Sequence, residues 1–284
     1  MMQVALILVR GLSLAILPGL FGLALFAKIR RWPLMAVTAF AISVSAIGFV
    51  LLAVAMTGGD PGALSGELLA MLLRDTAPGL AFVMRILLLA ALLVTLLARP
   101  MVPRCAVALF AAAATATLAW NGHGAMDPGA LGWVHLGADI VHMLAAGAWI
   151  GALVVFAGLV LRRAPDREEA TRALAGFAGA GSVIVAAILA TGLVNAARLI
   201  GVDGIARLPD TLYGRLMIVK LLLFGAMLGL ASANRFVLTP GLLASGDRGL
   251  RHLRISLSLE LAAAVLIVGL VGWAGTAEPP VSAG

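Results

Sequence analysis

The sequence predicts an all-α, polytopic integral membrane protein, a bundle of about eight transmembrane helices with both termini on the extracytoplasmic side. Of its 284 residues, 62% are hydrophobic and 12% charged, and the mean hydropathy is +1.10. A soluble domain carries about 25% charged residues to cover its surface. The apolar residues also come in blocks of about 20, the length that crosses a bilayer. Short basic connections separate the blocks, so hydrocarbon is the solvent that suits this chain.

Eight apolar runs are long enough to be spanning helices. In chain order they are Val4–Ala27, Leu34–Met56, Pro78–Ala98, Val102–Trp120, Leu131–Leu161, Leu174–Leu199, Leu212–Leu238 and Leu253–Ala274. The first is interrupted only by Arg10. The fifth is longer than a bilayer requires, so its first turns are expected to project into the interface or the helix to tilt. The longest connection, Thr57 to Ala77, is rich in glycine and proline and acidic, and we expect it outside.

The basic residues predict the orientation of the bundle. Most of the 20 lysines and arginines lie in alternate connections, on one side of the membrane. They are Lys28, Arg30, Arg31, Arg99, Arg104, Arg162, Arg163, Arg167, Arg172, Arg235, Arg248, Arg251 and Arg254. The positive-inside rule makes this side cytoplasmic. Their scatter between apolar blocks also argues against a nucleic-acid partner, despite the net charge of +7.

No internal repeat or long soluble segment divides the chain, so residues 1–284 are expected to form a single transmembrane domain. Two pairs of glycines at a spacing of four, Gly147 with Gly151 and Gly225 with Gly229, are typical of close helix contacts in lipid. No ATPase motif occurs, and no enzymatic activity is expected.

Residues 120–151 carry the polar groups that point to function. This stretch holds three of the four histidines, His123, His135 and His142. At about 100° per residue, His135, Asp139, His142 and Trp149 share one stripe of the fifth predicted helix. Ionisable groups in a membrane helix are costly and usually face the bundle interior, so the stripe should face a site.

Spacing limits what that site can hold. His135 and His142 are about 10 Å apart along the helix axis, too far to share one ion readily. A single ion would instead be held by His142 and His123 from adjacent helix ends, with Met126 or Met143 as a soft supplement. Imidazole with thioether and no thiolate favours copper before zinc or iron.

Other readings of these residues remain open. Asp139 could ligate the ion directly, or it could orient a ligating imidazole without contacting the ion itself. His135 is either a third ligand or a site where the ion arrives. The fourth histidine, His252, lies among cytoplasmic arginines and is interpreted as an interfacial residue. For the outer cluster, the alternative is a set of ordinary interfacial side chains.

Four motifs of the sequence point to a known family. They are Gly-His at 122–123, D-x-x-H-x-L-A-A at 139–146 with Trp149 and Gly151, YGRLMIVKLLLFGAMLGLASANRFVLTP at 213–240, and R-x-S-x-x-x-E at 254–260. Together they carry a resemblance to the CopD family of bacterial inner-membrane copper proteins. It is strongest over residues 120–275, and the eight-helix count agrees. It implies a multi-pass protein of the bacterial inner membrane that handles copper. A periplasmic copper chaperone of the CopC type, as a separate chain, is the implied partner, together with membrane lipid.

The matching stretches contain ionisable residues at membrane depth. Lys220 lies about two turns inside the seventh predicted helix from the outer surface, and Glu260 about two turns inside the eighth from the cytoplasmic end. Each is costly in lipid unless it is paired or faces a wet cavity. They lie on an ion path, or Lys220 snorkels outward and Glu260 pairs with Asn234 or Arg235. A further group is expected to brace helices around an outer vestibule: Arg10, Arg85, Asn195, Arg198 and Arg215.

Three functions fit these features. The first is a copper importer or permease that captures copper at His123, Asp139 and His142. The second is a membrane redox module that binds copper or haem b, in which His123 and His142 are axial ligands of one haem. The third is a scaffold that delivers copper to a partner without transporting it.

Overall fold

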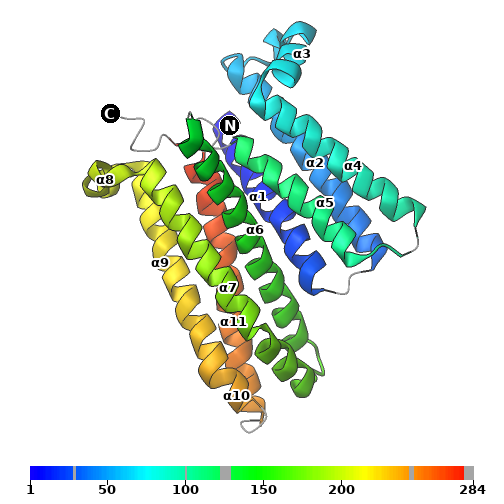
Figure 1. The fold of residues 1–284 in the computed structure, drawn as a ribbon, viewed down its shortest axis with the longest axis vertical. Coiled ribbons are helices and arrows are strands. Elements are labelled where there is room, and N and C mark those ends of the chain that lie inside the picture. The colour runs from blue at the N-terminus through cyan, green and yellow to red at the C-terminus, as the bar shows by residue number, and fades with distance from the viewer. Residues whose placement is uncertain (28–29, 100, 122–128, 243–245, 278–284) are drawn as a thin grey trace.

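The structure is a computed structural model that describes residues 1–27, 30–99, 101–121, 129–242 and 246–277. Nearly all of this part is helical and none of it is strand, which confirms the all-α prediction. Within the described residues, seven helices are long and apolar enough to cross a membrane (Figure 1). They are α1 (Met2–Phe26), α2 (Arg31–Met56), α4 (Ala77–Ala98), α6 (Gly129–Val160), α7 (Arg167–Leu199), α9 with its continuation (Leu212–Gly241) and α11 (Gly246–Ala274).

The fourth predicted span has a different form from the others. It is an α-helix, α5, only from Arg104 to Ala116, and continues as a 3₁₀ turn, η2, from Thr117 to Asn121. An α-helix of 13 residues is shorter than the bilayer core requires. The count of eight spans and the extracytoplasmic position of the termini therefore stay predictions.

A buried arginine fixes the change from α-helix to 3₁₀ turn. Arg85 of α4 is 3% exposed. Its Nε donates to Thr117 Oγ1 at 2.8 Å and its Nη2 to the Thr117 carbonyl at 3.2 Å. The Thr117 hydroxyl in turn donates to the Ala114 carbonyl at 2.7 Å. Arg85 thus holds α4 against η2, in the bracing role expected of it.

We expect Thr117→Val to destabilise the protein by about 1–3 kcal/mol, because it removes an acceptor from a buried guanidinium. The thermal unfolding midpoint of the detergent-solubilised protein should fall. Thr95→Val is the matched control, since the Thr95 hydroxyl is exposed and donates only to the Ala91 carbonyl of its own helix. Equal midpoints for the two variants would contradict the anchoring role of Arg85.

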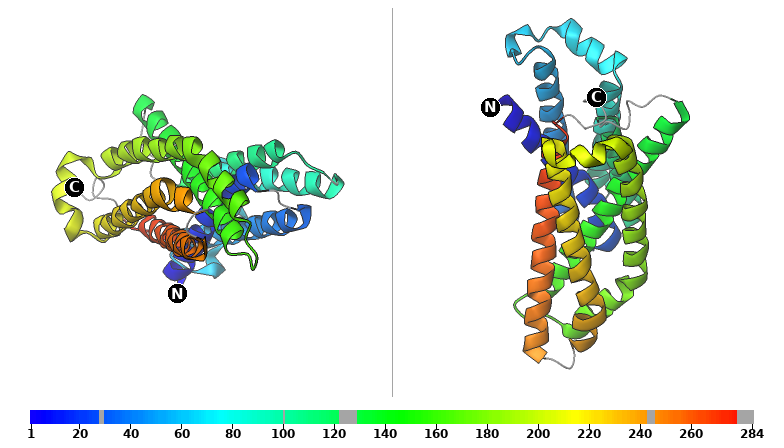
Figure 2. Two further views of the ribbon diagram at one scale, coloured as in Figure 1. Left: turned by 90° about the horizontal axis from the view of Figure 1, so that it is seen from below. Right: turned by 90° about the vertical axis from the view of Figure 1, so that its left-hand side faces the viewer.

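Helix α1 joins two groups of helices. It packs against α2 and α5 on one side and against α6 and α11 on the other. The first group, α2, α4 and α5, lies on one side of α1 and the second, α6, α7, α9 and α11, on the other (Figure 1), and α5 also contacts α6 directly. Within the second group α7 packs against α6 and α9 against α11, and α6 also contacts α11 (Figure 2).

The contact between α1 and α6 depends on glycine. A Cβ at Gly22 would collide with the Gly147 carbonyl, and a Cβ at Gly151 with the backbone of Gly22. A Cβ at Gly147 would collide with the Pro18 carbonyl of α1. The predicted close contact at Gly147 and Gly151 is confirmed. The same prediction for Gly225 and Gly229 is wrong, because a Cβ at either would meet nothing within 4 Å.

The segments between the long helices are short and capped. The predicted outer loop holds a 3₁₀ turn, η1 (Pro61–Ala63), and a helix, α3 (Gly66–Asp75), which lies at the far end of α2 and α4 (Figure 2). Asp166 caps α7, and Arg254 donates to the Val160 carbonyl at the end of α6 at 2.6 Å. Two further turns, α8 (Gly201–Gly204) and η4 (Ile205–Asp210), lead into α9.

Helix α9 does not end as a regular helix. It ends at Ala233 and passes into a π-helical turn, η5 (Asn234–Leu238), and a last turn, α10 (Thr239–Gly241). Pro240 has no N–H to donate, and its ring crowds the carbonyl one turn earlier, at Phe236. A wider turn relieves this clash, and π-turns are frequent at functional sites.

Candidate functional site

The polar stripe of α6 faces the bundle, as the sequence predicts. His135 is 1% exposed and Trp149 6% exposed. Asp139 and His142 are half-buried, and both bond to side chains of α7. The exposed face of α6 carries apolar groups such as Trp133.

Asp139 lies among opposite charges. Its Oδ1 accepts a hydrogen bond from Asn195 Nδ2 at 2.7 Å. Lys220 of α9, Arg10 of α1 and His135 are within range of electrostatic interaction with its carboxyl group. A carboxylate with this environment compensates two half-buried cations, which explains how they are tolerated inside the bundle.

The polar groups come from four helices and meet at Asp139 and His142 of α6. Asp139 is within electrostatic range of Arg10 of α1 and Lys220 of α9 and accepts from Asn195 of α7. His142 bonds to Thr191 of α7. Because the sequence predicts that this end of the bundle faces the extracytoplasmic side, we call the group of Arg10, Asp139, His142, Thr191, Asn195 and Lys220 the outer polar layer.

The hydrogen bonds of His142 define its tautomer. Its Nδ1 lies 3.0 Å from Thr191 Oγ1, and that hydroxyl donates its single proton to the Ala187 carbonyl at 2.6 Å. The hydroxyl can therefore only accept from the imidazole, so we infer that Nδ1 carries the proton. The lone pair of His142 is then on Nε2. A histidine that ligates a metal ion is usually held in this way by a donor bond from its other ring nitrogen.

The structure separates some of the other predicted ligands. Met143 packs with Leu17 and Leu118, on the side of α6 away from α7, because successive helical residues are about 100° apart. His123 and Met126 lie outside the described residues. Among the residues that the structure describes, no three histidine, cysteine or acidic side chains converge on one point.

The remaining predicted site residues have separate positions. Trp149 packs its ring edge to face against Phe224, with centroids 5.8 Å apart, in the apolar core. Arg215 is exposed at the start of α9. Lys220 is within electrostatic range of both Asp139 and His142.

In the half of the bundle that the sequence predicts to face the cytoplasm, Glu260 of α11 is bonded to Asn234 of η5. The predicted pairing with Asn234 is thus confirmed. The alternative pairing with Arg235 is wrong, because the Arg235 guanidinium turns to α7 and bonds to Ser182 Oγ at 2.6 Å. The π-helical turn directs the two neighbouring side chains to different helices.

Sequence reasoning missed Thr191, the partner of His142. A signal was present, since Thr191 and Asn195 are one turn apart and hence on one face of an otherwise apolar helix. Both face the α6 stripe in the structure. A matched pair of polar residues at this spacing indicates which face of a neighbouring helix meets the site.

The fold and the outer polar layer define a polytopic helical membrane protein with ionisable groups inside its bundle. Residues 1–133 match the N-terminal domain of copper resistance protein D-like proteins, and residues 171–274 match copper resistance protein D. The chain is 40% identical to copper resistance protein D of Pseudomonas syringae pv. tomato, over 93% of this chain and 94% of that protein. It is 31% identical to inner membrane protein YebZ of Escherichia coli (strain K12), over 66% of this chain and 65% of that protein. No solved structure matches it.

The chain therefore belongs to the copper resistance protein D family, and it is a multi-pass protein of the inner membrane with a copper-related function. The resemblance stated from the sequence is confirmed, and it extends into the N-terminal third. The polar stripe of α6, from His135 to Trp149, lies between the two matched segments. Neither family model covers this stripe, so the roles of its residues are inferred from their geometry in the structure.

Proposed function

We propose that the chain is a copper permease of the inner membrane, and not an enzyme, that takes copper from the periplasmic side through the outer polar layer. His142 is its central ligand, together with His123 and either Met126 or His135. The observation that supports this most is the bond of His142 to Thr191, which leaves an Nε2 lone pair on a ring held in place by its other nitrogen.

The charges of the layer suggest how strongly it binds. Asp139 is engaged by Asn195, so it acts as a counter-ion for Lys220 and Arg10 more than as a ligand. With two cations and one carboxylate, the layer opposes a metal cation overall. Neutral imidazole and thioether groups bind soft copper by covalent character and not by charge. Binding is then weak enough for the ion to leave inward, as conduction requires.

The driving force is electrical or chemical. The sequence holds no ATP-binding motif. The membrane potential contributes about 2.3 kcal/mol per charge and 100 mV, which favours inward movement of a cation. A periplasmic chaperone of the CopC type, as a separate chain, would deliver copper at the outer face.

Uptake of radioactive copper into proteoliposomes that contain the purified protein tests this function. An inside-negative potential should accelerate uptake above that of protein-free vesicles. Copper binding without uptake would instead support a delivery scaffold. A Soret band in the purified protein would favour the haem-binding alternative.

Lys220→Met should tighten copper binding about tenfold, because it removes a positive charge near His142. Equilibrium titration of the detergent-purified protein with copper measures the change. Arg215→Met is the matched control, since it removes the same charge from an exposed position of the same helix. Weaker binding in Lys220→Met would mean that Lys220 supports the site and does not oppose the ion.

A further inference from the structure

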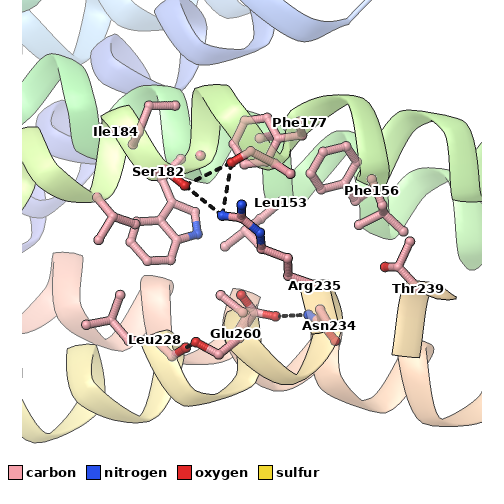
Figure 3. Close-up of a pocket in the computed structure, with 18 of the residues that line it drawn as sticks. Leu153, Phe156, Phe177, Ser182, Ile184, Leu228, Asn234, Arg235, Thr239 and Glu260 are labelled. Atoms are coloured by element: carbon pink, nitrogen blue, oxygen red, sulfur yellow. Dashed lines mark hydrogen bonds between the residues drawn. The ribbon is translucent and has the colours of Figure 1, made fainter. Parts of the chain in front are cut away.

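A second polar group lies in the other half of the same bundle. Side chains of α6, α7, α9 with η5, and α11 line a cavity of about 380 Å³ (Figure 3). Most of its wall is apolar, with the rings of Trp149, Phe156 and Phe177. Its polar residues include Asn234 and Thr239, from the π-helical turn and the residue after it, and Glu260 of α11.

Glu260 is a buried acid with a neutral partner. It is 1% exposed, and Asn234 Nδ2 donates to its Oε1. Among the described residues, no lysine, arginine or histidine forms an ion pair with it. A buried carboxylate with no cation beside it is strongly disfavoured, whereas the neutral acid is tolerated when it is hydrogen-bonded.

The charged groups of the surrounding helices are engaged elsewhere. From η5, Arg235 bonds to the Ala178 carbonyl and Ser182 Oγ of α7, as Figure 3 shows. On α11 itself, Arg254 bonds to the carbonyls of Val160 and Arg162. On α1, which packs against α11, Arg10 lies beside Gly275 at the opposite end of that helix. The parts of α6, α7 and α9 that line the cavity carry no ionisable side chain.

Buried oxygen atoms beside Glu260 have unused hydrogen-bonding capacity. Asn234 and Thr239 are each 5% exposed, and Asn234 Oδ1 and Thr239 Oγ1 have no hydrogen-bond partner. Ser256 Oγ, one turn before Glu260 on α11, has none either. Such atoms are rare in native proteins, and each calls for an explanation such as a chemical role or a polar guest that completes its hydrogen bonds.

The chemistry of the lining selects the guest. The lining contains no imidazole, thioether or thiolate, so it does not suit a soft copper ion. A hard metal cation needs several oxygens that point to one centre. The Asn234 amide instead presents its nitrogen to the carboxyl group, so its oxygen does not converge with Glu260 on one ion. A proton needs only one carboxyl oxygen.

We propose that Glu260 is a proton-binding site in the inner half of the bundle, which takes up and releases a proton within the cavity beside Asn234 and Thr239. The second carboxyl oxygen of Glu260 carries the proton in the neutral state, and the Asn234 amide stabilises the anion after the proton leaves. If the proposed copper transport holds, such a site allows a proton to move in exchange for the inward cation. Proton binding itself does not depend on that function.

Infrared difference spectroscopy of the purified full-length protein in lipid nanodiscs, without copper, tests the proposal. A carboxylic acid C=O band should disappear reversibly as the pH is raised and shift in heavy water. Glu260→Gln should lose the band, and its amide keeps a hydrogen bond with Asn234 after a flip. The matched control Asp247→Asn removes an exposed acid of the same helix and should retain the band.

Asn234→Ala gives a second measurement that keeps Glu260 in place. Loss of the donor to the carboxylate should move the disappearance of the band to higher pH, since a hydrogen bond to the charged form favours that form. A merely structural contact would leave the band insensitive to pH, and this result would overturn the proposal. Disappearance of the band on addition of sodium chloride at constant pH would also overturn it, in favour of a metal cation. If the proteoliposomes take up no copper but the carboxylic acid band of Glu260 still responds to pH, only the proposed copper transport is rejected, and the proton-binding site stands.

Discussion

His142→Ala should lower the copper affinity of the purified protein by about 100-fold, the largest functional effect that we expect. Loss of the Nε2 lone pair removes a ligand outright. Loss of a group that only hydrogen-bonds to a ligand typically lowers metal affinity 10–100-fold. Thr191→Val should therefore cost about tenfold, because the ring stays but is no longer held by the hydroxyl. Copper titration followed by separation of bound and free metal measures both changes.

Two comparisons make this prediction specific. His135→Ala should weaken binding no more than His142→Ala, since His135 lies about two turns away from His142, nearer the start of α6. A protein in which His123 and His142 are both replaced should bind no copper at this site. Affinity unchanged from wild type in that double variant would reject the ligand assignment.

Gly147→Val should destabilise the bundle by more than about 3 kcal/mol, the largest structural effect that we expect. A Cβ at Gly147 would collide with the Pro18 carbonyl of α1, and backbone cannot move aside as a flexible side chain can. Helices α1 and α6 would have to separate, which would also disturb α11, since it packs on both. The thermal unfolding midpoint and the yield of monodisperse protein in detergent should both fall sharply.

Gly158→Val is the matched control on the same helix. Gly158 is exposed, and a Cβ there would meet nothing within 4 Å. This substitution introduces the same β-branched side chain into α6 without the collision. If the two variants unfold at the same temperature, close backbone contact does not stabilise the α1–α6 pair.

Most of the helices followed from the sequence because each apolar run of about 20 residues has one stable form in lipid. The orientation of the α6 stripe also followed, since helical periodicity alone places His135, Asp139, His142 and Trp149 on one face. The pairing of Glu260 with Asn234 was one of two alternatives. Local geometry at Pro240 decided between them, by a π-turn that directs Arg235 to α7.

The sequence by itself determined the class of this protein, its long apolar helices with one exception and the face on which its polar groups lie. These properties depend on periodicity and on the cost of polar groups in hydrocarbon, which are local. Only the tertiary structure decided that Thr191 holds His142 and that Met143 packs away from it. It also decided that Gly151 lies in close contact with α1, whereas a Cβ at Gly225 would meet nothing within 4 Å. Each of these depends on which helix lies opposite, and that choice is made by the packing of the whole bundle.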